Sequence, residues 1–265
     1  MKRYKTGFFA GTFDVFRRHH LEMLMRAKAL CENLFVGIYT DETVAKATQS
    51  KPLIPFCDRC QIVESIRYVD QVFPLMDDDF STIRHQYPFE VVFNETEEEN
   101  MPQDLPELQS SFICHERTTI PDDHQVVGYT TGTYDLFHIG HLNVIRRAKE
   151  LCDYLIVGVS TDELVASYKH HQPVYRQDER MEIIGSLKYV DQVIEQKTLD
   201  KMDVWKELHF NKLFHGDDWK GSSLYNRIEE DLKTIGCEII YLPHTEGVSS
   251  SNIRSHIKQS WRKNN

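Results

Sequence analysis

The chain has 265 residues, of which 40% are hydrophobic, and it carries a formal net charge of -10 at pH 7. This length fits one large domain or two of ordinary size. The acidic balance argues against nucleic acid as a partner, because nucleic-acid-binding proteins carry a basic footprint. No apolar run is long enough for membrane insertion, and Met1–Tyr4 leads directly into a strand instead of a signal peptide. Six cysteines without a disulfide framework fit a reducing compartment, so we expect a cytoplasmic protein.

An internal repeat organises the sequence. Gly7–Phe16 matches Gly128–Phe137, and the alignment continues without a gap to Tyr68–Val72 against Tyr189–Val193. Roughly four positions in ten are identical over this stretch, which indicates a duplicated domain. We therefore predict one domain over residues 1–124 and a second over residues 125–265.

Strands and helices alternate along both copies. In the first copy we expect strands at 4–10 and 34–39, with a Gly-Thr turn after the first strand. The predicted strands of the second copy are 126–131, 154–159, 192–194, 212–215 and 237–242. Its predicted helices are 142–151, one that begins within 160–163, 179–188, 224–235 and 249–258. This alternation predicts an α/β fold of tandem Rossmann-like, doubly wound parallel-sheet domains. Ligands would then bind beyond the carboxyl ends of the strands, where the strand order switches.

The segment between the copies, residues 95–125, is acidic and contains prolines. Its apolar stretch Phe112–Cys114 is predicted to supply the last strand of the first domain. Residues 118–125 are predicted to form a linker.

One segment of the second copy suits phosphate chemistry, namely His138-Ile139-Gly140-His141 at a strand-to-helix turn. A helix that begins near Gly140 would direct free N–H groups and its positive dipole end at a ligand. Glycine permits close approach of the backbone, and two imidazoles one turn apart can donate hydrogen bonds to phosphate oxygens. The alternative is a pair of surface histidines at a helix start. The preceding Gly-Thr-aromatic-Asp run favours phosphoryl or nucleotidyl transfer.

Four ordered segments of the second copy resemble signatures of the HxGH nucleotidyltransferase superfamily and, within it, of the cytidylyltransferases. They are Gly132–His141, Leu187–Asp191, His215–Gly221 and Leu242–Ser251. The third is similar to the GDDWxG segment of glycerol-3-phosphate cytidylyltransferases. The fourth is similar to the family's Arg-Thr-x-Gly-Ile-Ser-Thr-Thr motif.

This resemblance implies a Mg-assisted reaction in which CTP and a phosphorylated alcohol give a CDP-alcohol and pyrophosphate. The implied partners are CTP and most closely glycerol 3-phosphate, with CDP-glycerol as product. Mg²⁺ is the implied cofactor and would arrive with CTP. We predict no metal site built from side chains of the protein.

The resemblance also implies roles for individual residues. His138 and His141 would stabilise the transferring phosphate, and Lys169 would grip the phosphate of the acceptor. The implied nucleotide-binding residues are Gly132, Thr133, Tyr134, Asp135, Gly140, Arg180, Lys188, Asp217, Ser249 and Ser250. The implied acceptor-binding residues are Lys169, Trp219 and His244. For Arg180, a cation on a helix surface is the alternative.

Two positions depart from the family pattern, because His244 and Lys188 stand where the family has arginine. Arginine makes a flat, permanently charged, two-pronged phosphate contact, whereas lysine is a point charge and histidine is half neutral near pH 6.5. Three interpretations are open. Lys169, Lys220 or Arg254 binds the phosphate in place of the family's arginines, the acceptor differs from glycerol phosphate, or activity is weaker.

The first copy lacks the chemical residues. Arg17 and His19 replace the first histidine and the glycine of the motif, and the acidic run Asn94–Glu98 replaces His215–Trp219. His20 alone is retained, so we predict a catalytically silent domain kept for packing. Because single-domain relatives work as dimers, the two repeats are predicted to form an internal pseudo-dimer, and a further homo-oligomer stays open.

Three other functions stay open at this point. The tandem architecture is similar to that of ethanolamine-phosphate cytidylyltransferases, which makes ethanolamine phosphate the alternative acceptor. The departures at His244 and Lys188 leave room for a nucleotide-binding regulatory protein without turnover. HxGH alone does not recognise the base, so adenylyl transfer from ATP is the third alternative.

Overall fold

The computed structural model describes residues 3–95, 125–169 and 171–263, with side chains up to Gln259. The chain divides into two compact units, Met1–Gln109 with Ser251–Asn265, and Ser110–Ser250. The predicted strand Phe112–Cys114 lies outside the described residues, and the predicted boundary after residue 124 falls at their edge. The last helix beyond Ser250 groups with the first unit, whereas the sequence predicts it in the second domain. The domain boundaries stay a prediction.

The second unit contains a five-stranded parallel sheet in the order β7-β6-β5-β8-β9. Its strands are β5 (Val127–Gly132), β6 (Tyr154–Ser160), β7 (Gln192–Gln196), β8 (Lys212–Gly216) and β9 (Glu238–Leu242). The first strand of the unit is central, and the strand order reverses between β5 and β8. This topology confirms the predicted doubly wound α/β fold.

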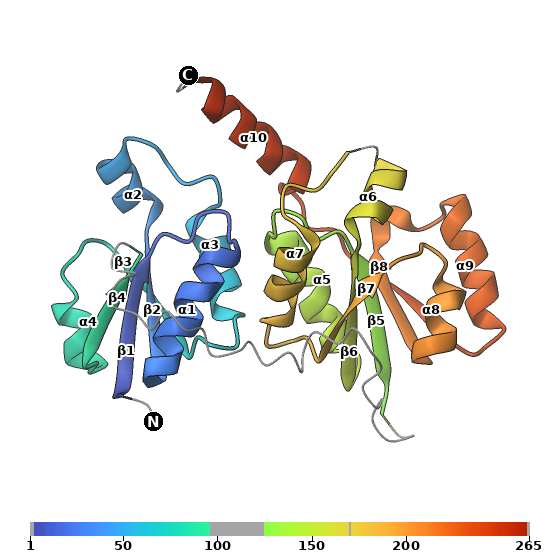
Figure 1. Cartoon of the computed structure of the whole chain (residues 1–265), viewed down its shortest axis with the longest axis horizontal. Coiled ribbons are helices and arrows are strands. Elements are labelled where there is room, and N and C mark those ends of the chain that lie inside the picture. Colours follow the sequence, from blue (N-terminus) through green and yellow to red (C-terminus); the bar gives the residue numbers. More distant parts are fainter. Residues whose placement is uncertain (1–2, 96–124, 170, 264–265) are drawn as a thin grey trace. The chain divides into compact units, whose positions relative to one another are not determined.

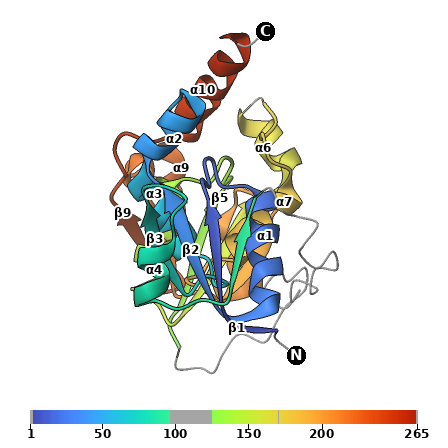
Figure 2. The same ribbon diagram turned by 90° about the vertical axis from the view of Figure 1, so that its left-hand side faces the viewer.

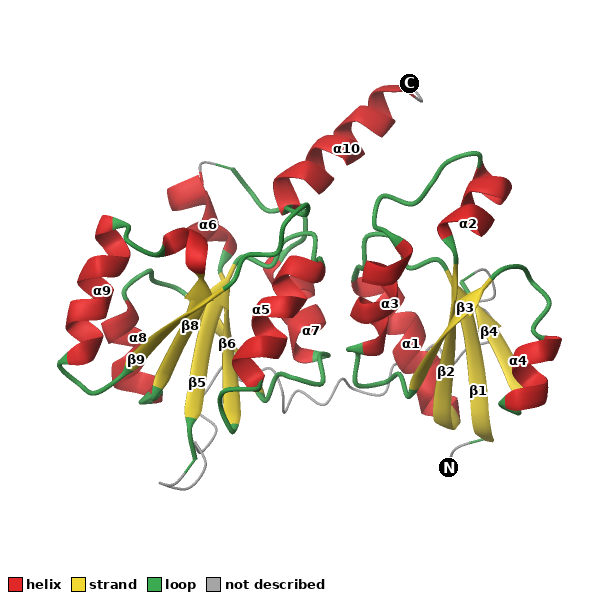
Figure 3. Cartoon of the chain, turned by 180° about the vertical axis from the view of Figure 1, so that it is seen from behind, coloured by secondary structure: helices red, strands yellow, loops and turns green. Residues whose placement is uncertain are grey.

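Helices cover both faces of this sheet. In Figures 1 and 3, α5 (Ile139–Lys149) and α7 (Gln177–Gly185) lie on one face, and α8 (Lys201–Leu208) and α9 (Ser223–Lys233) lie on the other. Apolar residues of β5, β8 and α9, such as Tyr129, Leu213 and Leu232, form a buried core under α8 and α9. Three further helices begin beyond the carboxyl ends of the strands: α6 (Asp162–Lys169), the 3-10 helix η3 (Asp217–Trp219) and α10 (Ser250–Lys263). The sequence did not predict α8.

The first unit repeats the first four strands of this arrangement in the order β3-β2-β1-β4. Its strands are β1 (Tyr4–Gly11), β2 (Cys31–Tyr39), β3 (Gln71–Leu75) and β4 (Val91–Asn94). Its helices are α1 (Arg18–Leu30), α2 (Asp41–Thr48), α3 (Phe56–Glu64) and α4 (Ser81–Gln86). In Figures 1 and 2, α1 and α3 lie on one face of the sheet and α4 on the other. An aromatic cluster that includes Phe8, Phe73 and Phe89 fills the space under α4.

The strand register makes the two units comparable residue by residue. Phe8 pairs with Phe35 and Val92, and the aligned Tyr129 pairs with the aligned Ile156 and Leu213. The gapless alignment of the sequences is therefore also the alignment of the sheets. In the described part of the chain, no helix is both long and apolar enough to cross a membrane.

Candidate active site

The turn that follows the first strand is strained in both units, after β5 in the second unit and after β1 in the first. Tyr134 and Leu136 have φ values of 53° and 50°, and the aligned Phe13 and Val15 have φ values of 56° and 49°. Such left-handed conformations cost energy for residues with large side chains, and surrounding structure must hold them in place. Because the first unit keeps the same turn without the HxGH motif, the strain belongs to the fold.

Asp135, between these two residues, fixes the loop before α7. Its carboxylate accepts hydrogen bonds from the backbone N–H groups of Val174 and Tyr175, at 2.9 and 3.0 Å. Asp14 holds the equivalent loop of the first unit in the same way. Asp135 thus orients the loop, and its nucleotide contact stays a prediction.

His138 caps the first turn of α5 with its own ring. Its Nδ1 accepts a hydrogen bond from the N–H of Gly140 at 3.1 Å, so the proton of the neutral ring is on Nε2. Burial, and secondarily the charge of His244, lower the pKa of His138 to about 4. A Cβ atom at Gly140 would lie 2.9 Å from Cε1 of His138, so any other residue there would displace the ring.

His141 stacks on His138, with ring centroids 3.9 Å apart. The edge of Tyr134 packs against it, with centroids 5.4 Å apart. Burial lowers the pKa of His141 well below its usual value, and the nearby His138 and Lys169 act in the same direction. Both histidines are therefore neutral near pH 7, and both can donate hydrogen bonds to an anion.

Lys169 is the last residue of α6 and lies beside the turn that follows β5. Its Nζ donates to Oγ1 of Thr133 at 2.9 Å, and the hydroxyl of Tyr168 lies 3.1 Å from the same oxygen. The carbonyl of Gly132 accepts a hydrogen bond from Ser160 at 3.3 Å. The structure thus brings Lys169 and Thr133 together, and the charge of Lys169 acts on His141, while the roles of both residues stay predictions.

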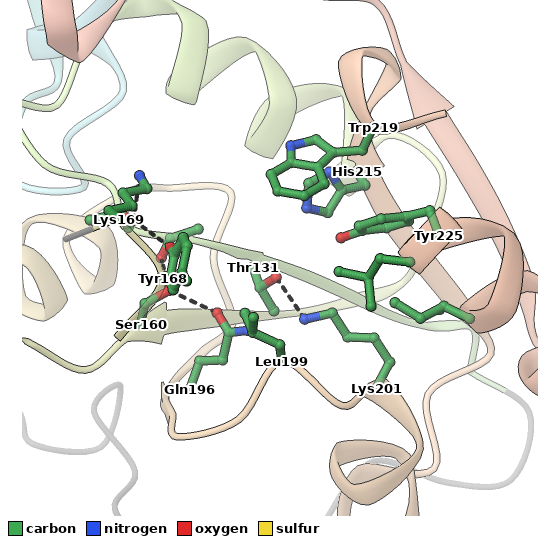
Figure 4. Close-up of a pocket in the computed structure, with 14 residues that line it drawn as sticks. Thr131, Ser160, Tyr168, Lys169, Gln196, Leu199, Lys201, His215, Trp219 and Tyr225 are labelled. Carbon is green, nitrogen blue, oxygen red and sulfur yellow. Dashed lines mark hydrogen bonds between the residues drawn. The ribbon is translucent and has the colours of Figure 1, made fainter. Parts of the chain in front are cut away.

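A pocket opens beyond the carboxyl ends of β5, β6, β7 and β8, next to this turn (Figure 4). Each of these strands contributes one polar residue to the lining, namely Thr131, Ser160, Gln196 and His215. Lys169 and Trp219 also line it, and Leu199, Leu224 and Ile228 close its apolar side.

Lys201, the first residue of α8, lines the same pocket and was missed from the sequence. Only 3% of its surface is exposed, and its Nζ donates to Oγ1 of Thr131 at 3.2 Å. Burial lowers the pKa of Lys201 to about 8, against an opposing contribution from Asp200. The signal that could have found it is the capping residue Asp200, whose carboxylate accepts from the N–H of Met202 at 2.8 Å.

Two segments close the other side of the site. The carboxylate of Asp217 accepts a hydrogen bond from the N–H of His244 at 3.0 Å, which ties η3 to the loop before α10. The hydroxyl of Ser250 donates to the carbonyl of Asp135 at 2.8 Å and lies 3.3 Å from Nε2 of His138. Ser249 directly precedes α10. The structure therefore brings Ser250 to His138 and joins Asp217 to His244, whose charge acts on His138.

Arg180 occupies a different environment from either of its predicted ones. Its side chain is fully buried, and its guanidinium donates to the carbonyls of Tyr175 and Thr133 and to Asp162. The alternative of a helix-surface cation is wrong, because no part of the side chain reaches solvent. Arg59 makes the equivalent contacts in the first unit, which favours a structural role, and the predicted nucleotide contact of Arg180 stays a prediction.

Lys188 is not brought to the site. It precedes β7, whereas the pocket lies where β7 ends, so the exposed Lys188 is at the opposite end of the sheet. A contact between Lys188 and a nucleotide in this unit would need a different arrangement of the chain.

In the first unit, His20 and Glu95 contact the backbone at the turn and helix start that correspond to the predicted site of the second unit. Nδ1 of His20 accepts a hydrogen bond from the N–H of Arg17 at 3.3 Å, so this retained histidine caps α1. A carboxylate oxygen of Glu95 accepts from the N–H of Thr12 at 3.3 Å. A Cβ atom at Gly11 would lie 2.6 Å from the same oxygen. The turn after β1 is thus covered by a carboxylate of the protein itself.

Comparisons with known proteins agree with this geometry. Residues 8–122 and residues 129–256 each match the sequence profile of a family described as cytidylyltransferase-like. The chain belongs to this family. The double match confirms the tandem organisation predicted from the repeat.

Relatives of this cytidylyltransferase-like chain differ in their acceptors. Glycerol-3-phosphate cytidylyltransferase of Staphylococcus aureus (strain NCTC 8325 / PS 47) is 40% identical over 129 residues, which are 48% of this chain and 92% of the relative. Ethanolamine-phosphate cytidylyltransferase of Mus musculus is 33% identical over 141 residues, 50% of this chain and 33% of the relative. Probable ethanolamine-phosphate cytidylyltransferase of Encephalitozoon cuniculi (strain GB-M1) is 24% identical over 271 residues, 83% of this chain and 84% of the relative. Of these three relatives, the one with the greatest identity is named for glycerol 3-phosphate, and the one with the longest coverage is named for ethanolamine phosphate.

Proposed function

We propose that the second unit transfers the cytidylyl group of CTP to a small phosphorylated alcohol, with glycerol 3-phosphate as the leading acceptor. The products are CDP-glycerol and pyrophosphate. The observation that carries this proposal is a pocket beside two neutral histidines that contains two lysines and, among its described lining residues, no carboxylate.

In this reaction a phosphate oxygen of the acceptor attacks the α-phosphorus of CTP. A P–O bond forms, and the bond between the α-phosphorus and the oxygen bridging to the β-phosphate breaks, so pyrophosphate leaves. Nε2–H of His138 is available for a phosphate oxygen once it turns from Ser250. His141 and Lys169 lie next to it and add a second donor and a positive charge. No residue needs to act as a nucleophile.

Mg²⁺ is proposed as the companion of the CTP phosphates. Among the described residues, no group of three or more His, Cys, Asp or Glu side chains is arranged to hold a metal ion. Mg²⁺ commonly binds substrate phosphates with few protein ligands, so the role proposed here does not require such a group. It would neutralise charge on the departing pyrophosphate.

The charge of the pocket supports glycerol phosphate over ethanolamine phosphate. Lys169 and Lys201 favour the anionic phosphate of either acceptor. The ammonium group of ethanolamine phosphate would need an anionic partner, and the buried Lys201 would repel it. A neutral polyol has no such requirement.

Ethanolamine phosphate is the second candidate, because the pocket also presents aromatic faces. Trp219 and Tyr225 lie 5.5 Å apart by ring centroid, and aromatic faces attract ammonium groups. The relatives that carry this name also include the one with the longest stated coverage of the chain, 83%.

A pyrophosphate-release screen tests the proposal. CTP and ATP are each combined with glycerol, ethanolamine, choline and ribitol phosphates, with Mg²⁺ present. We expect CTP with glycerol 3-phosphate to give the highest kcat/KM. Preference for ethanolamine phosphate would select the second candidate, and no release from any pair would support a binding protein without turnover.

A further inference from the structure

Asn143 joins the helix that carries the two histidines to the loop that precedes α10. It follows His141 on α5, and only 9% of its surface is exposed. Its Oδ1 accepts a hydrogen bond from Nη2 of Arg146 at 2.9 Å, and its Nδ2 donates to Oγ1 of Thr245 at 3.0 Å. Because a guanidinium group can only donate, Arg146 fixes which end of the amide carries the oxygen. The amide nitrogen of Asn143 is therefore directed at Thr245.

The loop that receives this bond, residues 243–248, is held by polar contacts. The structure describes each of its residues, and none of them is buried or belongs to a helix or strand. Arg147 donates to the carbonyl of Pro243 at 2.9 Å, and the N–H of His244 donates to Asp217 at 3.0 Å. Segments with few buried apolar contacts open locally at low cost in free energy. The position of this loop therefore depends on its hydrogen bonds.

The same loop leads from β9 to the histidines. After burial, the charge of His244 is the second cause of the lowered pKa of His138, so these two side chains are near each other. A Cβ atom at Gly140 would lie 3.5 Å from Cγ1 of Val248, which places Val248 at the start of α5. The hydroxyl of Ser250, in the first turn of α10, lies 3.3 Å from Nε2 of His138. A shift of the loop would therefore move this helix start, whose N–H groups suit phosphate, relative to the histidines.

The first unit has no amide at the corresponding position. Glu22 and Met25 are aligned with Asn143 and Arg146, and Glu22 pairs with Arg18 of its own helix at 3.0 Å. A requirement of the shared fold would apply to both copies. Asn143 occurs only in the copy that has the HxGH motif, which favours a role in the reaction over a role in the fold.

We propose that Asn143 is a positioning residue that holds the loop 243–248 and the start of α10 where they bind the phosphates of CTP. This inference rests on the proposed function. Asn143 acts through Thr245 and does not itself touch the nucleotide. Contacts from the loop would serve bound CTP and the transition state alike, so loss of the amide weakens CTP binding and leaves kcat largely unchanged.

The test removes each end of this hydrogen bond in turn. Asn143→Leu keeps a side chain of similar size without polar atoms, and Thr245→Val replaces the hydroxyl by a methyl group. We expect each variant to bind CTP about tenfold more weakly by titration calorimetry, with kcat for pyrophosphate release within about threefold of wild type. Because both changes remove one bond, the double variant should bind CTP within about twofold of the weaker single variant. Glu22→Leu, the matched control at the aligned position of the first unit, should leave CTP affinity and kcat unchanged.

Hydrogen exchange supplies a readout that does not depend on turnover. Without substrate, the backbone N–H groups of residues 244–249 should exchange at least about fivefold faster in Asn143→Leu and in Thr245→Val than in wild type. Those of β5 should exchange as slowly as in wild type, because the sheet does not depend on this bond. Unchanged exchange of residues 244–249 in both variants would overturn the proposal.

The other outcomes separate this inference from the proposed function. CTP affinity within about twofold of wild type, a loss confined to kcat, or losses that add in the double variant would overturn the role of Asn143 and leave the transferase activity in place. Absence of turnover by wild type with every acceptor would overturn the proposed function, while CTP affinity and exchange would still decide the role of Asn143. Absence of CTP binding by wild type would overturn both. If thermal melting shows that Asn143→Leu does not fold, Thr245→Val decides the proposal, because it removes the same bond from the half-buried loop side.

Discussion

Replacing Arg180 by methionine tests whether this arginine holds the fold or the nucleotide. The guanidinium donates at 3.1, 2.6 and 2.5 Å to the carbonyls of Tyr175 and Thr133 and to the carboxylate of Asp162. Breaking a buried ion pair typically costs about 3–5 kcal/mol. The Asp162 side chain is 33% exposed, so water can solvate the remaining carboxylate, and we expect a loss near the lower limit, about 3 kcal/mol. This loss corresponds to a Tm about 10 °C lower.

The matched control is Arg59→Met in the first unit, for which we expect a similar loss. Two of the three tryptophans, Trp205 and Trp219, are in the second unit, and the third is Trp261. Tryptophan fluorescence in urea therefore reports mainly on Arg180→Met, and calorimetry follows both variants. CTP binding is measured by titration calorimetry at a temperature where each variant is folded, and it should stay within about threefold of wild type. If Arg180→Met kept its stability but bound CTP more than tenfold more weakly, or if Arg59→Met were as stable as wild type, the structural interpretation would be refuted.

Three further predictions follow from the site and the repeat. Replacing His138 or His141 by alanine should lower kcat for pyrophosphate release by roughly 100-fold or more with little change in CTP affinity, since a transition-state contact is lost; an equal weakening of CTP binding would contradict this. The free energy of unfolding, measured in urea, should fall as pH drops from 6.5 toward 4. In the folded chain, the pKa is lowered to about 3 for His20 and to about 4 for His138 and His215. The unfolded chain takes up protons at these histidines near pH 6.5, whereas the folded chain does not, so acid favours unfolding. A constant urea midpoint from pH 7 to 5 would argue against buried neutral rings. If the two repeats act as a pseudo-dimer, residues 125–265 expressed alone should lose stability or activity, and a stable, fully active monomer would exclude that pairing.

Much of the fold could be predicted from local pattern. Continuous apolar runs become the buried strands, and the turn with His138 and Gly140 lies beyond the carboxyl end of β5 as expected for parallel strands. The short helix α8 was not predicted, because its amphipathic pattern spans only about two turns and its main signal is the Asp200 cap. Missing this helix also removed Lys201 from the predicted site.

Other features depend on contacts between distant segments. The burial of Lys201 results from packing of α8 over the sheet, and the pairing of Ser250 with His138 joins residues far apart in the chain. Arg180 was predictable in principle, because the first copy keeps Arg59 at the aligned position while it lacks the residues of the HxGH motif. A residue kept without that motif is more readily explained by the fold, and the shared contacts of these two arginines agree with that view.

Glu95 would make it difficult for the first unit to regain a phosphate-binding turn by mutation. Its carboxylate lies against the amide of Thr12, where the second unit has the open turn at Thr133. Restoring histidine at position 17 and glycine at position 19 would therefore leave an internal anion facing any incoming phosphate. Reversion would also require replacement of Glu95, and this third change brings no gain until the other two are present. The silence that the repeat predicts for the first unit would thus be protected against single-step reversal, and sequence drift could continue there without recreating a second reaction centre.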